Sequence, residues 1–473
     1  MTAENGLRSS VGWNALSLGG RQGVRVVTSI VLAGMIGRSN FGIAGLAAVY
    51  VGFAAVFAGF GLDLVLVQRN DLRAEHVGAA TRLAAFTGSL IALGTVLLAP
   101  FIAGIFRTPE LVDVLRFVAI AVVVRSAAVV PMGLLMRRQD FASIAKAEIV
   151  GTVLGAGVGL LSALVERSYW AVVLQLVATE ALILLGLLFA ERGFRWNTTP
   201  AATKAVWTFG VKLLGANIAS FAAMNSDNVI VGRQLGPAAL GEYGIAYRVV
   251  SFPQQIVGQV VARTVIPVFS RLQDDPGAVA DLFYRSGRAI GIAVIGPLTI
   301  VALSAETLVG CILGEEWLPA VPAVQWLCVT AMIRLSFGNG GHVLISIGRA
   351  STNLAWTWLT TIVGICGFLV GVRWGTAGVA ASSVVIGIPG SLAGLAVVAR
   401  EIPITPFGVV SRLSRAAAGA LAVLATWYGL ARVGAGHVLI QVVAGALVYV
   451  AVVWTSSDVR EDILTFVGRR EVT

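Results

Sequence analysis

Five arginines fall near the middle of long apolar segments, at depths where a charged side chain is costly in a membrane. These are Arg21, Arg25, Arg125, Arg248 and Arg334. Each central arginine costs about 2.5–3.5 kcal/mol on insertion, so these side chains must face water, a partner or a substrate. Only Glu180 carries a negative charge at the same depth. The pattern predicts a cavity that binds an anion. The alternative is an internal network of ion pairs with Glu180 and Asp227.

Two further patterns support such a cavity. Arg21 and Arg25 are four residues apart, so they share a helix face and favour an anion between them. A polar face follows in the segment 204–231. Its members recur at steps of three and four residues and so project to one side of a helix, toward the predicted cavity. They are Asn217, Ser220, Met224, Asp227 and Asn228.

The composition indicates that membrane-spanning helices position these residues. With 57% hydrophobic residues, 12% charged residues and a mean hydropathy of +0.87, the chain is too apolar for a soluble domain and fits a polytopic membrane protein. At roughly 20 to 25 residues per span, 473 residues hold about fourteen helices and leave no room for a soluble domain. The expected fold is therefore all-α. The predicted segments are 13–36, 41–67, 77–105, 111–135, 142–165, 169–190, 204–231, 238–266, 279–313, 319–346, 352–373, 376–398, 409–432 and 436–455.

An internal repeat organises these segments. Residues 36–42 match residues 235–241 at a constant offset of 199 residues. We therefore predict a six-helix lobe over 1–195, a second over 196–400, and two extra helices with a tail over 401–473. Pro253, halfway along the segment 238–266, predicts a kink, either used for gating or static. Glycines at helix-packing intervals predict close helix contacts. They are Gly151, Gly155 and Gly159, Gly367 and Gly371, and Gly390 and Gly394.

The distribution of positive charge predicts the orientation. The N-terminus lacks the pattern of a cleaved secretory signal, so the first helix is expected to insert with the N-terminus cytoplasmic. The loops and ends that would then be cytoplasmic carry sixteen arginines and lysines, and the opposite loops carry six. Both termini and the linker 191–203 are thus predicted to be cytoplasmic. The net charge of +10 reflects this topology and does not indicate a nucleic-acid partner. The three cysteines and three histidines lack metal-ligand spacing, so we predict neither a metal nor a cofactor.

Two segments carry a resemblance to a known family. MIGRSNFGIAGLAAVYVGFAAVFAGFGLDLVLVQR and NSDNVIVGRQLGPAALGEYGIAYRVVSFPQQI resemble the two halves of bacterial polysaccharide exporters. These are the Wzx-like, lipid-linked oligosaccharide flippases of the multidrug/oligosaccharidyl-lipid/polysaccharide (MOP) superfamily. The matching residues are Asn225, Asp227, Gly232, Leu235, Gly236, Leu240, Gly241, Tyr243 and Pro253, followed by the run PVFSRL at 267–272.

The resemblance implies a plasma-membrane (inner-membrane) transporter and no enzyme. It implies two six-helix lobes that move a polyprenyl-diphosphate-linked oligosaccharide, a precursor of lipopolysaccharide or exopolysaccharide, to the outer leaflet by alternating access. The last two helices are expected to form a groove for the lipid tail. H⁺ or Na⁺ as coupling ion, membrane lipid and the polysaccharide polymerase are the other expected partners. In this interpretation Arg21, Arg25, Arg248 and Arg334 bind the headgroup. Arg125 and Glu180 support them, and Asn217, Asp227 and Asn228 contact sugar or the coupling cation.

Two other classes of protein stay open on these residues. A cation-coupled drug exporter of the same superfamily would share the fold, but its usual substrates are cations and would favour an acidic cavity. A membrane enzyme of polysaccharide assembly, such as a polymerase or ligase, typically needs a large outer loop that carries its catalytic groups. The short outer loops predicted from the sequence argue against such an enzyme.

Overall fold

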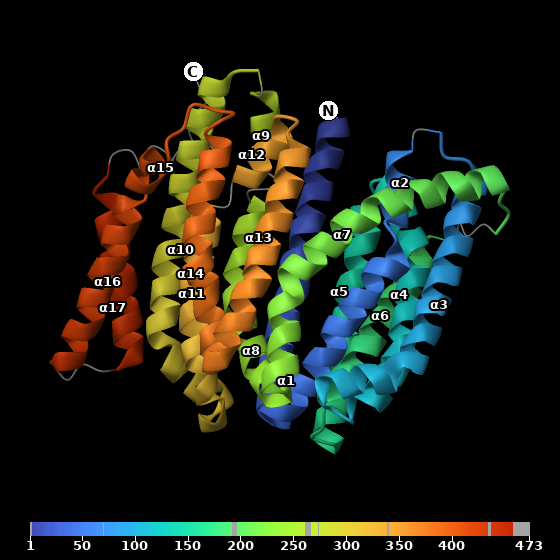
Figure 1. Ribbon diagram of the computed structural model, residues 1–473, viewed down its shortest axis with the longest axis horizontal. Coiled ribbons are helices and arrows are strands. Elements are labelled where there is room, and N and C mark those ends of the chain that lie inside the picture. The colour runs from blue at the N-terminus through green and yellow to red at the C-terminus, as the bar shows by residue number, and fades with distance from the viewer. Residues whose placement is uncertain are drawn as a thin grey trace. The chain divides into compact units, whose positions relative to one another are not determined.

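The computed structural model describes residues 2–69, 71–191, 196–260, 266–272, 274–337, 340–433 and 437–456. These residues form helices, turns and loops, and no strand occurs among them, so the all-α prediction is confirmed. The chain divides into two compact units, residues 1–244 and 245–473. Figure 1 labels the helices of both units. The predicted lobe boundaries after residues 195 and 400 stay predictions.

The described part of the first unit contains seven helices and the start of an eighth. They are α1 (Thr2–Gly59), α2 (Leu62–Gln68), α3 (Ala74–Phe106), α4 (Leu111–Arg137), α5 (Phe141–Val165), α6 (Trp170–Ala190), α7 (Pro200–Leu235) and the first residues of α8 (Pro237–Val260). Within this unit α3 packs on α4, α5 on α6, and α1 on α4, α5 and α7. The N-terminal half of α7 runs across α2 and α3 before the helix bends downward (Figure 1).

The remaining helices belong to the second unit. They are α9 (Ile266–Arg271), α10 (Pro276–Leu313), η2 (Glu315–Ala320), α11 (Val321–Phe337), α12 (Gly340–Ser346), α13 (Ala350–Gly371), η3 (Val372–Trp374), α14 (Gly375–Val398), α15 (Pro406–Arg412), α16 (Ser414–Arg432) and α17 (Val438–Trp454). α10, α11, α13 and α14 stand side by side, and the α16–α17 hairpin packs on α10 (Figure 1). Tyr449 of α17 enters the space left by Gly296 and Gly419, and its hydroxyl donates to the Ile292 carbonyl at 2.8 Å.

Local sequence explains where several of these helices begin. Thr199 and Asp275 accept backbone hydrogen bonds from the first turns of α7 and α10, and a proline follows each of them. A capping oxygen satisfies donors that have no partner inside the helix, and proline fits the first helical position because it lacks an N–H. Asp140 caps α5 in the same way, accepting from the Ser143 N–H at 3.1 Å. The polar residues between apolar segments thus fix the helix ends.

Long apolar helices dominate both units. Among the described residues, eight helical stretches are long and apolar enough to cross a membrane, or nine if the bent pair α15–α16 counts as one span. The chain is therefore a multi-pass membrane protein. Two of the eight, 22–59 and 351–398, each cover parts of two predicted segments. The total of fourteen spans consequently stays a prediction, although each predicted segment overlaps helix in the structure.

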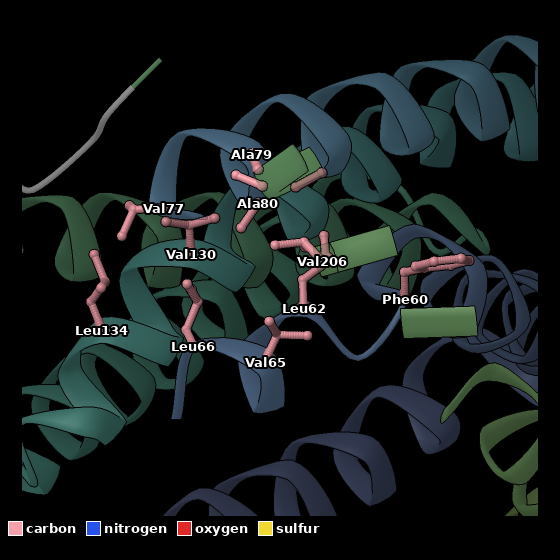
Figure 2. Close-up of a cluster of buried hydrophobic side chains, with 12 residues drawn as sticks. Phe60, Leu62, Val65, Leu66, Val77, Ala79, Ala80, Val130, Leu134 and Val206 are labelled. Carbon is pink, nitrogen blue, oxygen red and sulfur yellow. The ribbon is translucent and has the colours of Figure 1, made fainter. Parts of the chain in front are cut away.

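Two predicted helices are interrupted within the described residues: the segment 409–432, where α15 ends at Arg412 and α16 begins at Ser414 with a bend of 44°, and the segment 41–67. The segment 41–67 was expected to be continuous, but Phe60 and Gly61 have φ values of 50° and 65°, and the chain there separates α1 from α2. A left-handed residue cannot continue a right-handed helix. The break turns α2 into the core of the first unit, where Leu62 and Leu66 contact side chains of α3, α4 and α7. Figure 2 shows this core: Phe60, Leu62, Val65, Leu66, Val77, Ala79, Ala80, Val130, Leu134 and Val206.

Glycines set the distance between paired helices at most of the predicted positions. On α5, Gly151, Gly155 and Gly159 face Ile183, Thr179 and Gln175 of α6 so closely that no Cβ would fit. Gly367 and Gly371 of α13 face α14 in the same manner. Small residues at helix contacts let the two backbones approach closely. This packing matters in a membrane, because the hydrophobic effect does not drive helices together in lipid. The expectation is wrong for Gly390, because a Cβ there would enter open space.

Candidate functional site

A buried carboxylate joins the end of α7 to the start of α8. Asp227 is 8% exposed, and Tyr243 is completely buried. The Tyr243 hydroxyl donates to one Asp227 carboxylate oxygen at 2.9 Å. The Asn228 backbone and side-chain N–H groups donate to the other at 2.8 and 3.2 Å. A buried charge is tolerated when several donors replace its lost water, so this cluster gives Asp227 a role inside the fold.

The polar face predicted on α7 divides into two parts. Asp227 points into the α7–α8 contact, whereas the Met224 side chain is 60% exposed and Ser220 is also exposed. Asn217 and Asn228 are half-buried between these extremes. Asn217 and Asn228 are thus the amides of this face with surface left for a ligand.

The structure brings two predicted site residues together in an ion pair. Arg125 of α4 and Glu180 of α6 meet with an Nη1–Oε1 distance of 3.0 Å. The Glu180 side chain is 15% exposed and that of Arg125 is 49% exposed. The more buried carboxylate is therefore neutralised by an arginine that keeps half of its surface accessible.

The predicted headgroup arginines are distributed over both units. Arg25 lies on α1 with an exposed side chain, and Arg334 lies on α11 with an exposed side chain. Arg248 is half-buried on α8. Arg21 lies on α1 and Pro253 on α8, but their side chains fall outside the described residues. Arg25 belongs to the first unit, and Arg248 and Arg334 belong to the second.

Two matching turns lie beside each other at one end of the first unit. Gly37 interrupts α1 with φ 78° and ψ 163°, and Gly236 separates α7 from α8 with φ 86° and ψ −178°. Both conformations need a positive φ that glycine adopts without strain. The 199-residue offset pairs these two glycines, and the structure gives them nearly the same backbone conformation. The two segments that match in sequence thus form the same kind of turn.

The helices that follow the two turns touch each other reciprocally. A Cβ on Gly42 would overlap the carbonyl of Pro237, and a Cβ on Gly241 would overlap the carbonyl of Arg38. The offset relates Gly42 to Gly241 and Arg38 to Pro237, so the two contacts are equivalent. Each of these close backbone contacts requires the missing Cβ of one glycine.

An ion pair that the sequence did not predict fastens this contact. Arg38 Nη1 lies 2.7 Å from Glu242 Oε1, with side chains 41% and 10% exposed. Neither Arg38 nor Glu242 was among the predicted site residues. The internal repeat is the signal that could have found this pair. If the two repeats pack with two-fold symmetry, the helix that begins near Gly42 contacts the helix that begins near Gly241, and Glu242 directly follows Gly241.

Comparison with known proteins assigns the chain. Residues 31–322 match the family described as "Polysaccharide biosynthesis protein". The chain belongs to this family. The matched range contains both glycine turns, the Arg125–Glu180 pair and the Asp227 cluster.

Curated relatives carry names from polysaccharide biosynthesis. The chain is 26% identical over 356 residues to the succinoglycan biosynthesis transport protein ExoT of Rhizobium meliloti, covering 75% of this chain and 72% of ExoT. It is 25% identical over 354 residues to the teichuronic acid biosynthesis protein TuaB of Bacillus subtilis, covering 68% and 72%. It is 24% identical over 377 residues to the lipopolysaccharide biosynthesis protein WzxC of Escherichia coli, covering 77% and 74%. The resemblance to bacterial polysaccharide exporters is therefore confirmed.

Solved structures show the same fold. The lipid II flippase MurJ in an inward closed conformation superposes with a TM-score of 0.75, covers 95% of this chain and 99% of MurJ, and is 11% identical. An inward-facing multidrug resistance transporter of the MATE family superposes with a TM-score of 0.61, covers 79% and 95%, and is 18% identical. At these identities the likeness concerns the fold alone.

Proposed function

We propose that this protein is a transporter that flips a polyprenyl-diphosphate-linked oligosaccharide from the cytoplasmic to the outer leaflet of the plasma membrane. Membership of the polysaccharide biosynthesis family carries the proposal. The relatives support it, since ExoT is named as a transport protein of succinoglycan biosynthesis and WzxC as a lipopolysaccharide biosynthesis protein. The fold is also that of a lipid II flippase, which supports transport of a lipid-linked substrate.

The chemistry of such a substrate explains the polar residues in the helices. A diphosphate with a sugar chain cannot cross hydrocarbon, because each polar group would lose its water without a replacement. Guanidinium groups bind phosphate oxygens through paired donors and stay charged when partly desolvated. We assign the headgroup to Arg21, Arg25, Arg248 and Arg334 for this reason. The cavity between lobes and the alternating access belong to the same proposal.

The observed pairs refine the other assigned roles. The Arg125–Glu180 ion pair supports the predicted structural role of both residues. Asp227 is already bonded to Tyr243 and Asn228, so it holds α7 and α8 together instead of binding sugar directly. Asn217 remains the better candidate on this face for contact with sugar or with a coupling ion, H⁺ or Na⁺. The α16–α17 hairpin packs on α10. We assign to this hairpin the groove for the lipid tail.

Depletion of the protein in its own host tests the proposed function. Lipid-linked oligosaccharide should accumulate, and an impermeant glycan-modifying enzyme added to intact cells should fail to reach it. Mass spectrometry of the accumulated lipid would identify the glycan. A plasmid copy of the gene should restore access. Normal exposure of the oligosaccharide after depletion, in a strain without a second exporter, would contradict the proposal.

A further inference from the structure

A cationic cavity lies in the first unit where the beginning of α7 meets α3. Its volume is about 620 Å³. Arg82 of α3 and Lys204 of α7 line it, together with Thr198, Thr203 and the indole of Trp207. None of these residues belongs to the transport site proposed above. The cavity therefore needs a separate explanation.

The two cations are the groups of this cavity that are available to a ligand. Thr203 donates to the Thr199 carbonyl at 3.0 Å, and the Thr198 and Thr203 hydroxyl oxygens lie 3.2 Å apart. In the described parts of the chain, the Arg82 and Lys204 side chains have no ion-pair or hydrogen-bond partner. Two positive charges that line one cavity and have no ion-pair partner among the described residues attract an anion.

An apolar groove lies next to this cavity. It has a volume of about 360 Å³ and runs between Phe53, Phe57 and Phe60 of α1 and Leu90 and Leu98 of α3. The polar groups along it are already satisfied: the Tyr50 and Thr95 hydroxyl oxygens lie 2.8 Å apart, and Thr87 bonds to the Leu83 carbonyl. The groove thus offers mostly apolar surface to a ligand.

The cavity and the groove share a wall. Trp207, which lines the cavity, stacks on Phe60, which lines the groove, with ring centroids 4.8 Å apart. α3 connects them as well. Arg82, Phe86 and Leu90 follow at four-residue steps along α3, and all three are exposed. A positively charged surface therefore continues directly into an apolar one.

We propose that the cavity and groove together bind one anionic phospholipid of the surrounding bilayer. The phosphodiester lies between Arg82 and Lys204, and one acyl chain lies along the phenylalanines of the groove. Basic residues near a membrane surface attract anionic lipids, and tryptophan prefers the headgroup level, where Trp207 lies in this arrangement. The bound lipid fastens the crossing half of α7 to α3.

Charge and size favour a phospholipid over a polyprenyl diphosphate. The two positive charges of Arg82 and Lys204 exceed the single negative charge of a phosphodiester by one. The nearby Glu75 carboxylate, which accepts from Thr199 at 3.0 Å, disfavours a more highly charged diphosphate. A groove of about 360 Å³ holds part of one acyl chain and is far too small for a long polyprenyl chain. The site therefore differs in ligand from the transport site.

The headgroup half of the site can be tested by native mass spectrometry of the full-length protein, released from nanodiscs of phosphatidylglycerol and phosphatidylcholine. Arg82→Gln and Lys204→Gln should each lower phosphatidylglycerol retention about fivefold, and the double variant by about thirtyfold. Arg400→Gln is the matched control, because Arg400 is exposed and lies outside the cavity. Equal retention in the double variant and the wild type would overturn the proposal.

The acyl half is tested by filling the groove. Gly94 lines the groove and a Cβ there meets no atom within 4 Å, so Gly94→Leu adds bulk only to the space assigned to the chain. Gly104→Leu makes the same change on α3, also in open space, but outside the groove. Gly94→Leu should lower retention and Gly104→Leu should not. Equal effects of the two variants would contradict an acyl chain in the groove.

Competition distinguishes the possible sources of the phosphate. Excess inorganic phosphate should leave bound phosphatidylglycerol in place, because it has no chain for the groove. If inorganic phosphate displaced phosphatidylglycerol, the site would bind free anions, and the phospholipid proposal would be wrong. Undecaprenyl diphosphate in equal amount should not displace phosphatidylglycerol. Its preferential binding, lost in the Arg82→Gln variant, would assign the site to the transported lipid and overturn the phospholipid proposal.

Discussion

Gly42 of α1 lies directly against the carbonyl group of Pro237, the first residue of α8. The equivalent contact joins Gly241 to the carbonyl of Arg38. Both contacts depend on the missing Cβ. The turns at Gly37 and Gly236 place these residues, so the first unit is closed at this end by two related backbone contacts.

Gly42→Ala should destabilise the protein by about 1–3 kcal/mol or more, because the added methyl group overlaps backbone that cannot move aside easily. Gly45→Ala is the matched control on the same helix, since its Cβ would make an ordinary contact with Leu240 at 3.7 Å. Alanine in place of glycine in a helix should itself stabilise by up to about 1 kcal/mol. Thermal unfolding of both variants in detergent checks the difference. Similar melting temperatures would argue against a tight contact at Gly42.

The Arg38–Glu242 pair should contribute about 1 kcal/mol, since Arg38 is 41% exposed while Glu242 is nearly buried. Arg38→Ala and Glu242→Ala should each lower the melting temperature, and the double variant should cost less than their sum. The exchanged pair, Arg38→Glu with Glu242→Arg, should recover part of the loss. Additive single effects would show that the two side chains do not interact in solution.

The Asp227 cluster should behave as one unit. Tyr243→Phe removes one hydrogen bond to a buried carboxylate, at an expected cost of about 1–3 kcal/mol. Asp227→Asn keeps an acceptor for the Tyr243 hydroxyl and should cost less than Asp227→Ala. Thermal unfolding of a double-mutant cycle over Asp227 and Tyr243 measures the coupling. A coupling energy near zero would mean that the bond seen at 2.9 Å adds nothing to stability.

Arg125→Ala should lower the amount of protein in the membrane, because it leaves the mostly buried Glu180 without its ion-pair partner. The expected cost lies between about 1 kcal/mol for an exposed pair and about 3 kcal/mol for a buried one. Removing both charges in Arg125→Ala with Glu180→Ala should restore the protein level. Immunoblotting of membrane fractions provides the measurement. A double variant as scarce as Arg125→Ala would point to a different reason for the loss.

Variants of Arg25 distinguish a role in transport from a role in folding. If its guanidinium group binds a diphosphate, Arg25→Lys keeps the charge but loses the paired donors, so export should fall between the wild type and Arg25→Ala. The protein level should hold in both variants, because the Arg25 side chain is exposed, Arg25→Lys keeps its charge, and Arg25→Ala removes a cation that is costly in an apolar segment. Export and protein level are measured together. A lower protein level in Arg25→Ala, rescued by Glu180→Ala, would make Arg25 structural.

Hydropathy predicted the helices well because each apolar segment must satisfy its own backbone within a membrane. The break at Phe60 and Gly61 escaped it, since this stretch is as apolar as the helices on either side. The three residues Gly59-Phe60-Gly61 were the available signal, as glycines flank the turn. Hydropathy averages over such a turn and conceals it.

Depth along the helices predicted that Arg125 and Glu180 belong to one polar network, and the structure pairs them. It could not predict that Tyr243 bonds to Asp227, because that bond depends on how α7 and α8 face each other. A hairpin argument would have helped, since the two residues lie at similar distances on either side of Gly236. The Arg38–Glu242 pair is 204 residues apart in the chain and needed the tertiary contact to be seen.

The turns at Gly37 and Gly236 fit together as two copies of one surface would. In an ancestor with a single repeat, the same turn would have met its copy in an isologous dimer, in which each contact occurs twice. After fusion the two edges could change independently. One edge now carries Arg38 and Glu242, whereas the offset places Pro237 and Ile43 on the other. Raised ionic strength should therefore weaken the contact that carries the Arg38–Glu242 ion pair and leave the uncharged counterpart unchanged.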